Sequence, residues 1–143
     1  MRAVNPWASY RQVATQTASS GQLVLMLFDG VIRFLERATS GFGLDDPAEA
    51  NQLISNNVLR AQAIIHELNV SLNMEEGGEF ADTLRQLYLY FDRRLQHSNL
   101  TKTMDGITEV IGRLTVLRDA WAQMLLQNQA QTAPDRAAEL LAA

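Results

Sequence analysis

Cysteine is absent from this sequence of 143 residues, and histidine occurs only twice, at His66 and His97. Without cysteine the chain forms no disulfide and offers neither a thiolate nucleophile nor a cysteine ligand for zinc. The histidines also lack the Glu-x-x-His pattern of di-metal helical bundles, because Ala63 and Arg94 stand three residues before them. We interpret both histidines as solvated surface side chains, and we predict no metal and no cofactor.

Recognisable catalytic patterns are missing as well. No glycine-rich loop leads into a lysine and a serine or threonine, so a phosphate-binding loop of that type is excluded. The hydroxyls of Ser71 and Ser98 have no base at a spacing that would activate them. We therefore predict that the protein is not an enzyme.

Positive charge is in short supply. The 12 basic residues, only one of them lysine, are outnumbered by 16 acidic residues, which gives a formal net charge of -4. Only Arg85, Arg93 and Arg94 come close to forming a basic patch. The negative charges of the nearby Asp82 and Asp92 partly offset them. Because a nucleic-acid-binding face needs concentrated positive charge to displace counterions, we predict no nucleic-acid partner.

No apolar run is long enough to cross a membrane. A spanning helix needs about 18 or more apolar residues, and Asp29 and Arg33 interrupt the longest apolar stretch, 23–35. Residues 1–20 are polar and lack the apolar centre of a secretory signal. We predict a cytoplasmic protein without membrane insertion.

Proline is rare and stands outside the periodic segments. The three prolines are Pro6, Pro47 and Pro134, so long helices can run through residues 48–133 without interruption. No segment shows sustained alternation of apolar and polar residues, which argues against strands. Four helical segments of about 20 residues, joined by short loops, predict an all-α fold, an antiparallel up-and-down four-helix bundle.

Local signals predict where these helices begin and end. Ser19 and Gln22 have the spacing of a capping box at the start of the first helix. Asp46 is placed as the N-cap of the second helix, with a proline at the first helical position. The pair Gly77-Gly78 indicates a turn before the third helix, and we expect another turn around residues 98–99.

The ends of the chain differ from the middle. We divide the sequence into an N-terminal arm (1–18), the four-helix bundle (19–126) and a C-terminal tail (127–143) that is rich in alanine and glutamine. We expect a mobile arm, whose Tyr10 is an aromatic side chain able to plug an apolar groove as a lid. The simpler alternative is that the aromatic residues of the arm anchor a frayed terminus, and the sequence favours neither.

The first helical segment carries more apolar surface than one core needs. Ten of the thirteen residues of 23–35 are apolar, and they form two stripes with helical spacing instead of one. The stripes are Val24, Leu27, Val31 and Phe34, and Leu25, Phe28, Ile32 and Leu35. We expect the chain itself to cover both stripes, which moves the partner surface to the other three helices.

Further motifs follow this stretch in a fixed order. They are Glu76-Gly-Gly-Glu79, Leu87-Tyr88-x-Tyr90, Arg94-Leu95 with Asn99 after it, Glu109-Val110 and Leu117-Arg118-x-x-Trp121. With the segment 23–35 they resemble the flagellin-specific export chaperones, the FliS family, over about residues 7–125. The chain departs from the family pattern at Ser20, Phe28 and Ser98, where proline, tyrosine and alanine are usual, and none of these changes removes an apolar groove residue.

The resemblance implies a function. Members of the family are four-helix bundles that bind the C-terminal region of flagellin in the cytoplasm, prevent its premature polymerisation and help deliver it to the type III flagellar secretion gate. In the family an N-terminal segment with a tyrosine, matched here by Tyr10, lies over part of the groove when no flagellin is bound. The export gate itself is a further candidate partner. The alternative is a self-associating structural bundle without a flagellin client.

The secondary stripes of the last three helices supply the candidate contacts for flagellin. An amphipathic client segment would bind there helix-in-groove, through many modest apolar contacts. The candidates are Leu53, Asn57, Ile64, Tyr88, Leu89, Ile107 and Ile111. For each residue the alternative is ordinary core packing, and Asn57 is the least core-like of them.

Overall fold

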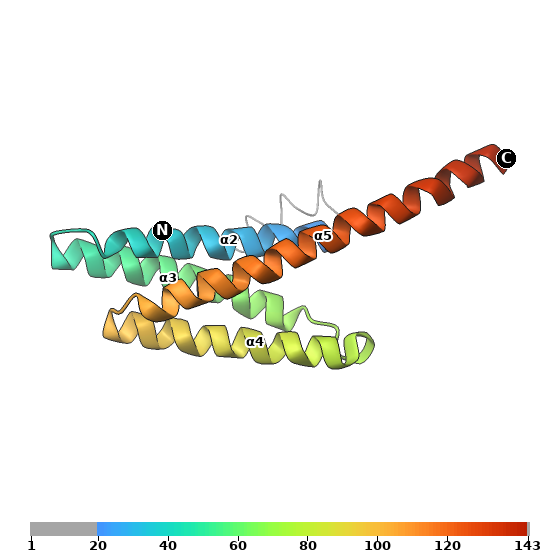
Figure 1. The fold of residues 1–143 in the computed structure, drawn as a ribbon. Coiled ribbons are helices and arrows are strands. Elements are labelled where there is room, and N and C mark those ends of the chain that lie inside the picture. The colour runs from blue at the N-terminus through green and yellow to red at the C-terminus, as the bar shows by residue number, and fades with distance from the viewer. Residues whose placement is uncertain (1–19, 143) are drawn as a thin grey trace, which may run out of the picture.

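The chain folds into four consecutive α-helices. The computed structural model describes the backbone of residues 20–142 and the side chains of residues 20–128. The helices are α2 (Ser20–Gly41), α3 (Pro47–Val70), α4 (Met74–Thr101) and α5 (Asp105–Ala142), and residues 20–142 contain no strand. Successive helices run in opposite directions (Figure 1), which confirms the predicted all-α, antiparallel up-and-down bundle. The predicted arm with Tyr10, and Ser19 of the capping box, lie outside the described residues.

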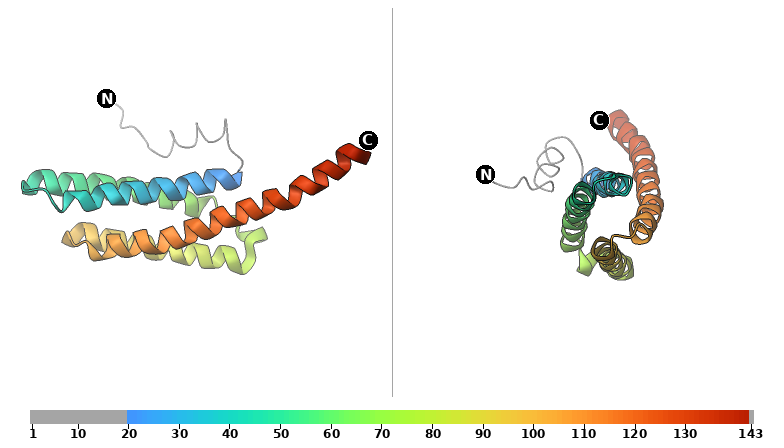
Figure 2. Two further views of the ribbon diagram at one scale, coloured as in Figure 1. Left: turned by 45° about the horizontal axis from the view of Figure 1, so that its top comes forward. Right: turned by 90° about the vertical axis from the view of Figure 1, so that its left-hand side faces the viewer.

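The helices form a closed ring around one core. α2 packs against α3 and α5, and α4 packs against the same two helices; the end-on view in Figure 2 shows the four at the corners of a square. Both apolar stripes of α2 are covered. Their buried members are Leu27, Phe28, Val31, Phe34 and Leu35, and the remaining three are half-buried. The prediction that α2 is covered on both stripes by the chain itself is therefore largely confirmed.

The start of α3 and the break near the start of α4 also follow the sequence signals. Asp46 is the N-cap of α3, where its carboxylate accepts a hydrogen bond from the N–H of Ala48 at 3.2 Å. Asn73 caps α4 in the same way, through the N–H of Glu76 at 3.1 Å. Gly78 has φ 54° and ψ −133°, a conformation that glycine adopts without steric cost. The predicted glycine turn is real, although one helical turn precedes it.

The turn expected around residues 98–99 lies further along the chain. α4 continues to Thr101, and Lys102 takes the left-handed conformation with φ 51°. The Nζ atom of Lys102 donates to the main-chain oxygen of Asn99 at 2.7 Å, and its own N–H bonds to the carbonyl of Ser98. The lone lysine therefore pairs with carbonyl groups that the end of a helix leaves without a partner. The sequence around residues 98–99, from which we expected the turn, gives no sign of this cap.

α5 is far longer than predicted. It continues as one helix to Ala142, through Pro134 and through most of the segment predicted as a tail, and it projects beyond the other three helices (Figure 1). Proline disfavours a helix interior. The residues around it are mainly alanine, glutamine, leucine and glutamate, which are strong helix formers.

The middle of α5 is fastened to the first turns of α2. The indole N–H of Trp121 donates to the main-chain oxygen of Gly21 at 2.9 Å, and the Trp121 ring meets Phe28 edge-to-face with centroids 6.1 Å apart. Arg118 binds the carboxylate of Asp29 at 2.7 Å. A Cβ atom at Gly21 would stand only 2.6 Å from Leu125. The two helices therefore approach closely where α2 begins.

Two glycines of α5 provide a test of this packing. A Cβ at Gly106 would stand 2.8 Å from the carbonyl oxygen of Arg94 and closer still to the Ser98 hydroxyl, whereas a Cβ at Gly112 meets nothing within 4 Å. We expect Gly106→Ala to lower the free energy of unfolding by about 1–3 kcal/mol through overpacking. The matched change Gly112→Ala should raise it by about 0.5–1 kcal/mol, because alanine is the better helix former.

Urea unfolding followed by far-ultraviolet circular dichroism measures both variants. Equal effects of the two substitutions would contradict the close approach of α4 and α5 at Gly106.

Candidate partner-binding surface

No group of three or more histidine and acidic side chains is placed to hold a metal within the described part of the chain. His66 and His97 are both exposed, as expected. Among the helices described, none is long and apolar enough to span a membrane. Large apolar side chains, in contrast, are exposed at several places in this part of the chain.

The structure divides the predicted flagellin contacts into two groups. Asn57, Ile64, Tyr88 and Ile107 are each at most 2% exposed and belong to the core of the bundle. Leu53 and Ile111 are half-buried, and Leu89 is 46% exposed. A partner that docks onto this conformation reaches only the last three. They come from three different helices, and Leu53 and Leu89 line different hollows.

A small hollow lies on the seam between α3 and α4. Its volume is about 70 Å³, and its lining includes Leu89 and Tyr88 together with His66 of α3. Burial raises the pKa of the Tyr88 phenol well above its usual value. Polar contacts close the seam on both sides of the hollow, since Gln62 bonds to Asp92 at 3.1 Å and Arg85 bonds to Asn69 at 3.3 Å. The hollow is therefore small and confined.

Two larger hollows lie along α2 and α3. One, of about 440 Å³, is at the connection between the two helices and is lined by Leu44, Leu53 and polar residues of α3. The other, of about 390 Å³, is at the start of α2 and is lined by Ser20, Leu23, Val24, Leu27, Glu67, Val70 and Ser71. Val70 is 63% exposed at its rim. Ser20, which also lines this hollow, is the first residue that the structure describes.

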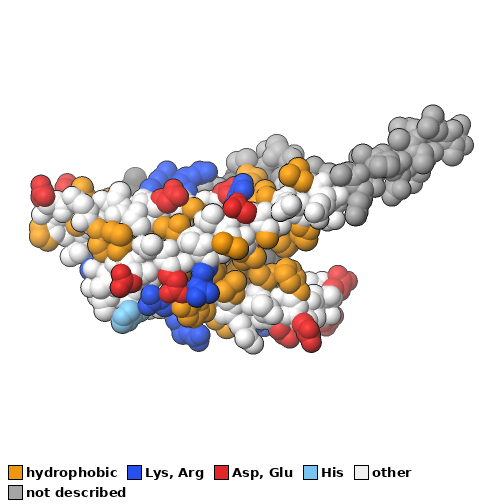
Figure 3. Space-filling model, viewed as in Figure 1, with side chains coloured by type: hydrophobic (Ala, Val, Ile, Leu, Met, Phe, Trp, Pro, Cys, Tyr) orange, Lys and Arg blue, Asp and Glu red, His pale blue; other side chains and the backbone are white. Residues whose placement is uncertain are grey.

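A longer apolar surface runs between α4 and α5, and we call it the α4–α5 strip. Its members on α4 and α5 are Phe80, Leu87, Val116, Leu117, Ala120 and Met124. Phe80 is 57% exposed, Val116 71% and Met124 38%. Figure 3 shows apolar side chains gathered where α5 rises away from α4. Phe80 and Met124 share the helical spacing of core residues, yet both are exposed because the two helices separate there.

A polar cluster ends the strip at the point where α4 and α5 come together. The Tyr90 hydroxyl donates to Glu109 at 2.5 Å, and Glu109 also pairs with Arg94 and with Arg113, each at 2.9 Å. The Arg113 guanidinium lies over the Tyr90 ring, 5.8 Å from its centroid. The hydrogen bond from Tyr90, followed by the two arginines, holds the pKa of Glu109 below its usual value, and the same bond raises the pKa of Tyr90.

Together the fold and these surfaces define a class of protein, an all-α bundle that exposes apolar hollows and an apolar strip along its helices. Comparison with known proteins identifies the family. A family model described as flagellar protein FliS matches residues 3–129 of this chain. The chain belongs to the FliS family of flagellar secretion chaperones, which confirms the resemblance found in its motifs.

Individual relatives agree with this assignment over most of their length. The chain is 36% identical to the flagellar secretion chaperone FliS of Bacillus subtilis strain 168 over 121 residues, which cover 85% of this chain and 86% of the relative. It is 36% identical to the Salmonella typhimurium strain LT2 protein of the same name over 120 residues, covering 81% and 87%. For the Escherichia coli K12 protein the identity is 35% over 130 residues, covering 88% and 93%.

Glu109 makes the stability of the bundle depend on pH. Because its pKa is lower in the folded chain, its charged form stabilises the fold above the unfolded pKa, which is about 4.3. That contribution is lost as the pH falls through the folded pKa. We expect Glu109→Gln to be less stable than the parent chain at pH 7, with the difference shrinking below about pH 4.

Urea unfolding at pH 7 and at a pH below about 4 measures the free energy of unfolding of both chains. Glu36→Gln serves as the control, since Glu36 is an exposed glutamate of α2 away from this cluster. A Glu109→Gln deficit of the same size at both pH values would rule out the carboxylate charge as its source.

Proposed function

We propose that this chain is a cytoplasmic type III flagellar secretion chaperone that binds the C-terminal region of flagellin. Binding prevents premature polymerisation and keeps the subunit available for delivery to the export gate, which we include as a further contact. Family membership supports the chaperone role. The observation that supports an extended polypeptide client is the spread of apolar surface over the bundle. Two hollows lie along α2 and α3, one lies on the seam between α3 and α4, and the α4–α5 strip runs between the other pair of helices.

A disordered, amphipathic client segment fits apolar surface that is spread over the bundle. A segment that is disordered until it assembles buries its apolar face only against a partner, and it can wrap over a large surface. Amphipathic helices dock into apolar grooves through residues spaced three and four apart. Ordering the segment is costly, so many modest contacts are needed. Of the flagellin contacts predicted from the sequence, Leu53, Leu89 and Ile111 are accessible, and we propose that these three contact the client.

The arm is proposed as a lid over the hollow at the start of α2. Ser20 lines that hollow, and the arm enters the bundle directly before it. Ten residue steps separate Ser20 from Tyr10, a reach of at most about 36 Å. An aromatic side chain buries a large apolar area when it fills such a hollow. A flagellin segment would compete with Tyr10 for the same surface.

Complex formation is the direct test of the client. We expect the purified chain and a C-terminal fragment of its cognate flagellin to form a one-to-one complex at micromolar concentration, measured by size-exclusion chromatography with light scattering. Absence of co-elution would refute the proposal. A stable oligomer of the chain alone that the fragment does not dissociate would instead support the self-associating structural bundle.

Removal of residues 1–18 tests the lid. We expect the shortened chain to bind the flagellin fragment at least as tightly as the full chain, because no competing segment has to be displaced. Titration calorimetry measures the affinity, and Tyr10→Ala in the full chain is the matched single change. A large loss of affinity on truncation would make the arm part of the binding surface.

A further inference from the structure

The α4–α5 strip has a defined direction because both of its walls are single helix faces. On α5, Glu109, Arg113, Val116, Ala120 and Met124 follow one another at spacings of three and four, so they share one face. Since Glu109 of this face meets α4, the apolar residues that follow it face the same way. The strip therefore starts at the polar cluster and widens toward the C-terminal half of α5.

The wall on α4 is built in the same way and sets the length of the strip. Phe80, Leu87, Tyr90 and Arg94 repeat at spacings of seven, three and four, which also places them on one helix face. The 14 residue steps from Phe80 to Arg94 span about 21 Å at the rise of an α-helix. A docked helix of about 14 residues would cover this length.

The narrow end of the strip carries cationic groups with unused hydrogen-bond donors. Arg94 and Arg113 both pair with Glu109 through Nε, and their side chains remain 31% and 60% exposed. A guanidinium has five N–H donors, so the terminal nitrogens of both arginines can still receive an anion. Glu109 neutralises one of the two charges, so these three side chains together carry one net positive charge.

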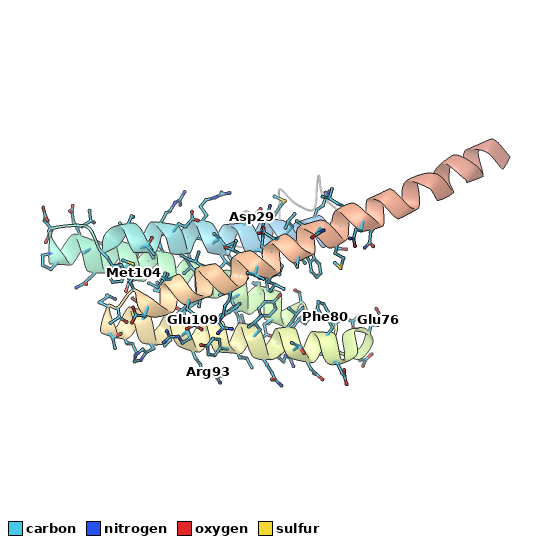
Figure 4. All side chains as sticks on the ribbon, viewed as in Figure 1. Asp29, Glu76, Phe80, Arg93, Met104 and Glu109 are labelled. Carbon is cyan, nitrogen blue, oxygen red and sulfur yellow. The ribbon has the colours of Figure 1, made fainter. Side chains whose placement is uncertain are left out.

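The wide end of the strip is acidic. Glu76 and Glu79 both come shortly before Phe80, the first residue of the α4 wall, and both are exposed. Figure 4 shows Glu76 and Phe80 at this end of α4 and Glu109 further along the bundle, between α4 and α5. The strip thus runs from a negative end to a positive end, and an α-helix carries the complementary polarity, with partial positive charge at its N-terminus and partial negative charge at its C-terminus.

We propose that the α4–α5 strip binds one amphipathic helix of the client parallel to α4. The N-terminal end of that helix lies beside Glu76 and Glu79. Its C-terminal end, with any acidic side chain there, lies beside Arg94 and Arg113. The apolar face of the helix covers Phe80 and the exposed residues of α5. This inference rests on the proposed function and adds to it a location and an orientation for one client segment.

Two pairs of variants test the location. We expect Phe80→Ala to weaken binding of the flagellin fragment about tenfold, because it removes a large apolar contact. Leu100→Ala is its control, since Leu100 is an exposed apolar residue of α4 (74%) outside the strip.

Arg113→Gln should weaken binding three- to tenfold at low salt. Arg37→Gln is matched to it, because the Arg37 guanidinium also lies over an aromatic ring, that of Phe34. Both controls should stay within twofold of the parent chain.

The orientation is tested separately, and the absence of cysteine makes single labels simple. A nitroxide is attached to Glu75→Cys in one sample and to His97→Cys in another, and amide signals of the ¹⁵N-labelled fragment are recorded. We expect the His97 label to broaden a stretch of the fragment that is C-terminal to the stretch broadened by the Glu75 label. The reverse order would overturn the parallel orientation.

The outcomes separate this inference from the proposed function. If the fragment binds neither the parent chain nor the variants, the flagellin client itself is wrong. If it binds the parent chain, and Phe80→Ala and Arg113→Gln bind as tightly as their controls, the flagellin proposal stands and the strip is not its docking site. Circular dichroism and urea unfolding of each variant identify any loss of affinity that comes from a loss of folding.

Discussion

The attachment of α5 to the first turns of α2 is the constraint on which the remaining surface depends. Trp121 and Arg118 fix the middle of α5 to Gly21 and Asp29, and the missing side chain at Gly21 allows this close approach. α5 is one continuous helix, and a helix cannot bend sharply without a specific cause. Because it leans toward α2 there, it leaves the N-terminal half of α4, and Phe80 with it, uncovered.

The cluster around Glu109 joins α4 and α5 at the other end of the α4–α5 strip, where the two helices come together. It joins α4 to α5 through one carboxylate that accepts from Tyr90, Arg94 and Arg113. A half-exposed ion pair alone contributes little to stability, whereas a shared carboxylate with several donors fixes the position of all of them. The two fastenings together set where the helices meet, where they separate and which charges border the apolar surface between them.

Much of the fold could be predicted because its signals are local. The long span without proline, the helical spacing of apolar residues and the Asp46 cap depend only on neighbouring residues. The end of α4 was misplaced because Lys102 caps it with a side chain that reaches back along the helix. The length of α5 was underestimated because a single proline outweighed the helix-forming residues around it.

The sequence by itself determined the helical class, the order of the helices and, through its motifs, the FliS family. It did not determine the exposed surface, because spacing shows which residues share a helix face and not whether a second helix covers that face. Asn57 and Ile64 are thus enclosed by the bundle, whereas Phe80 and Met124, which share the spacing of core residues, are exposed. Only the tertiary structure decided this, since the angle between α4 and α5 depends on contacts between residues far apart in the chain.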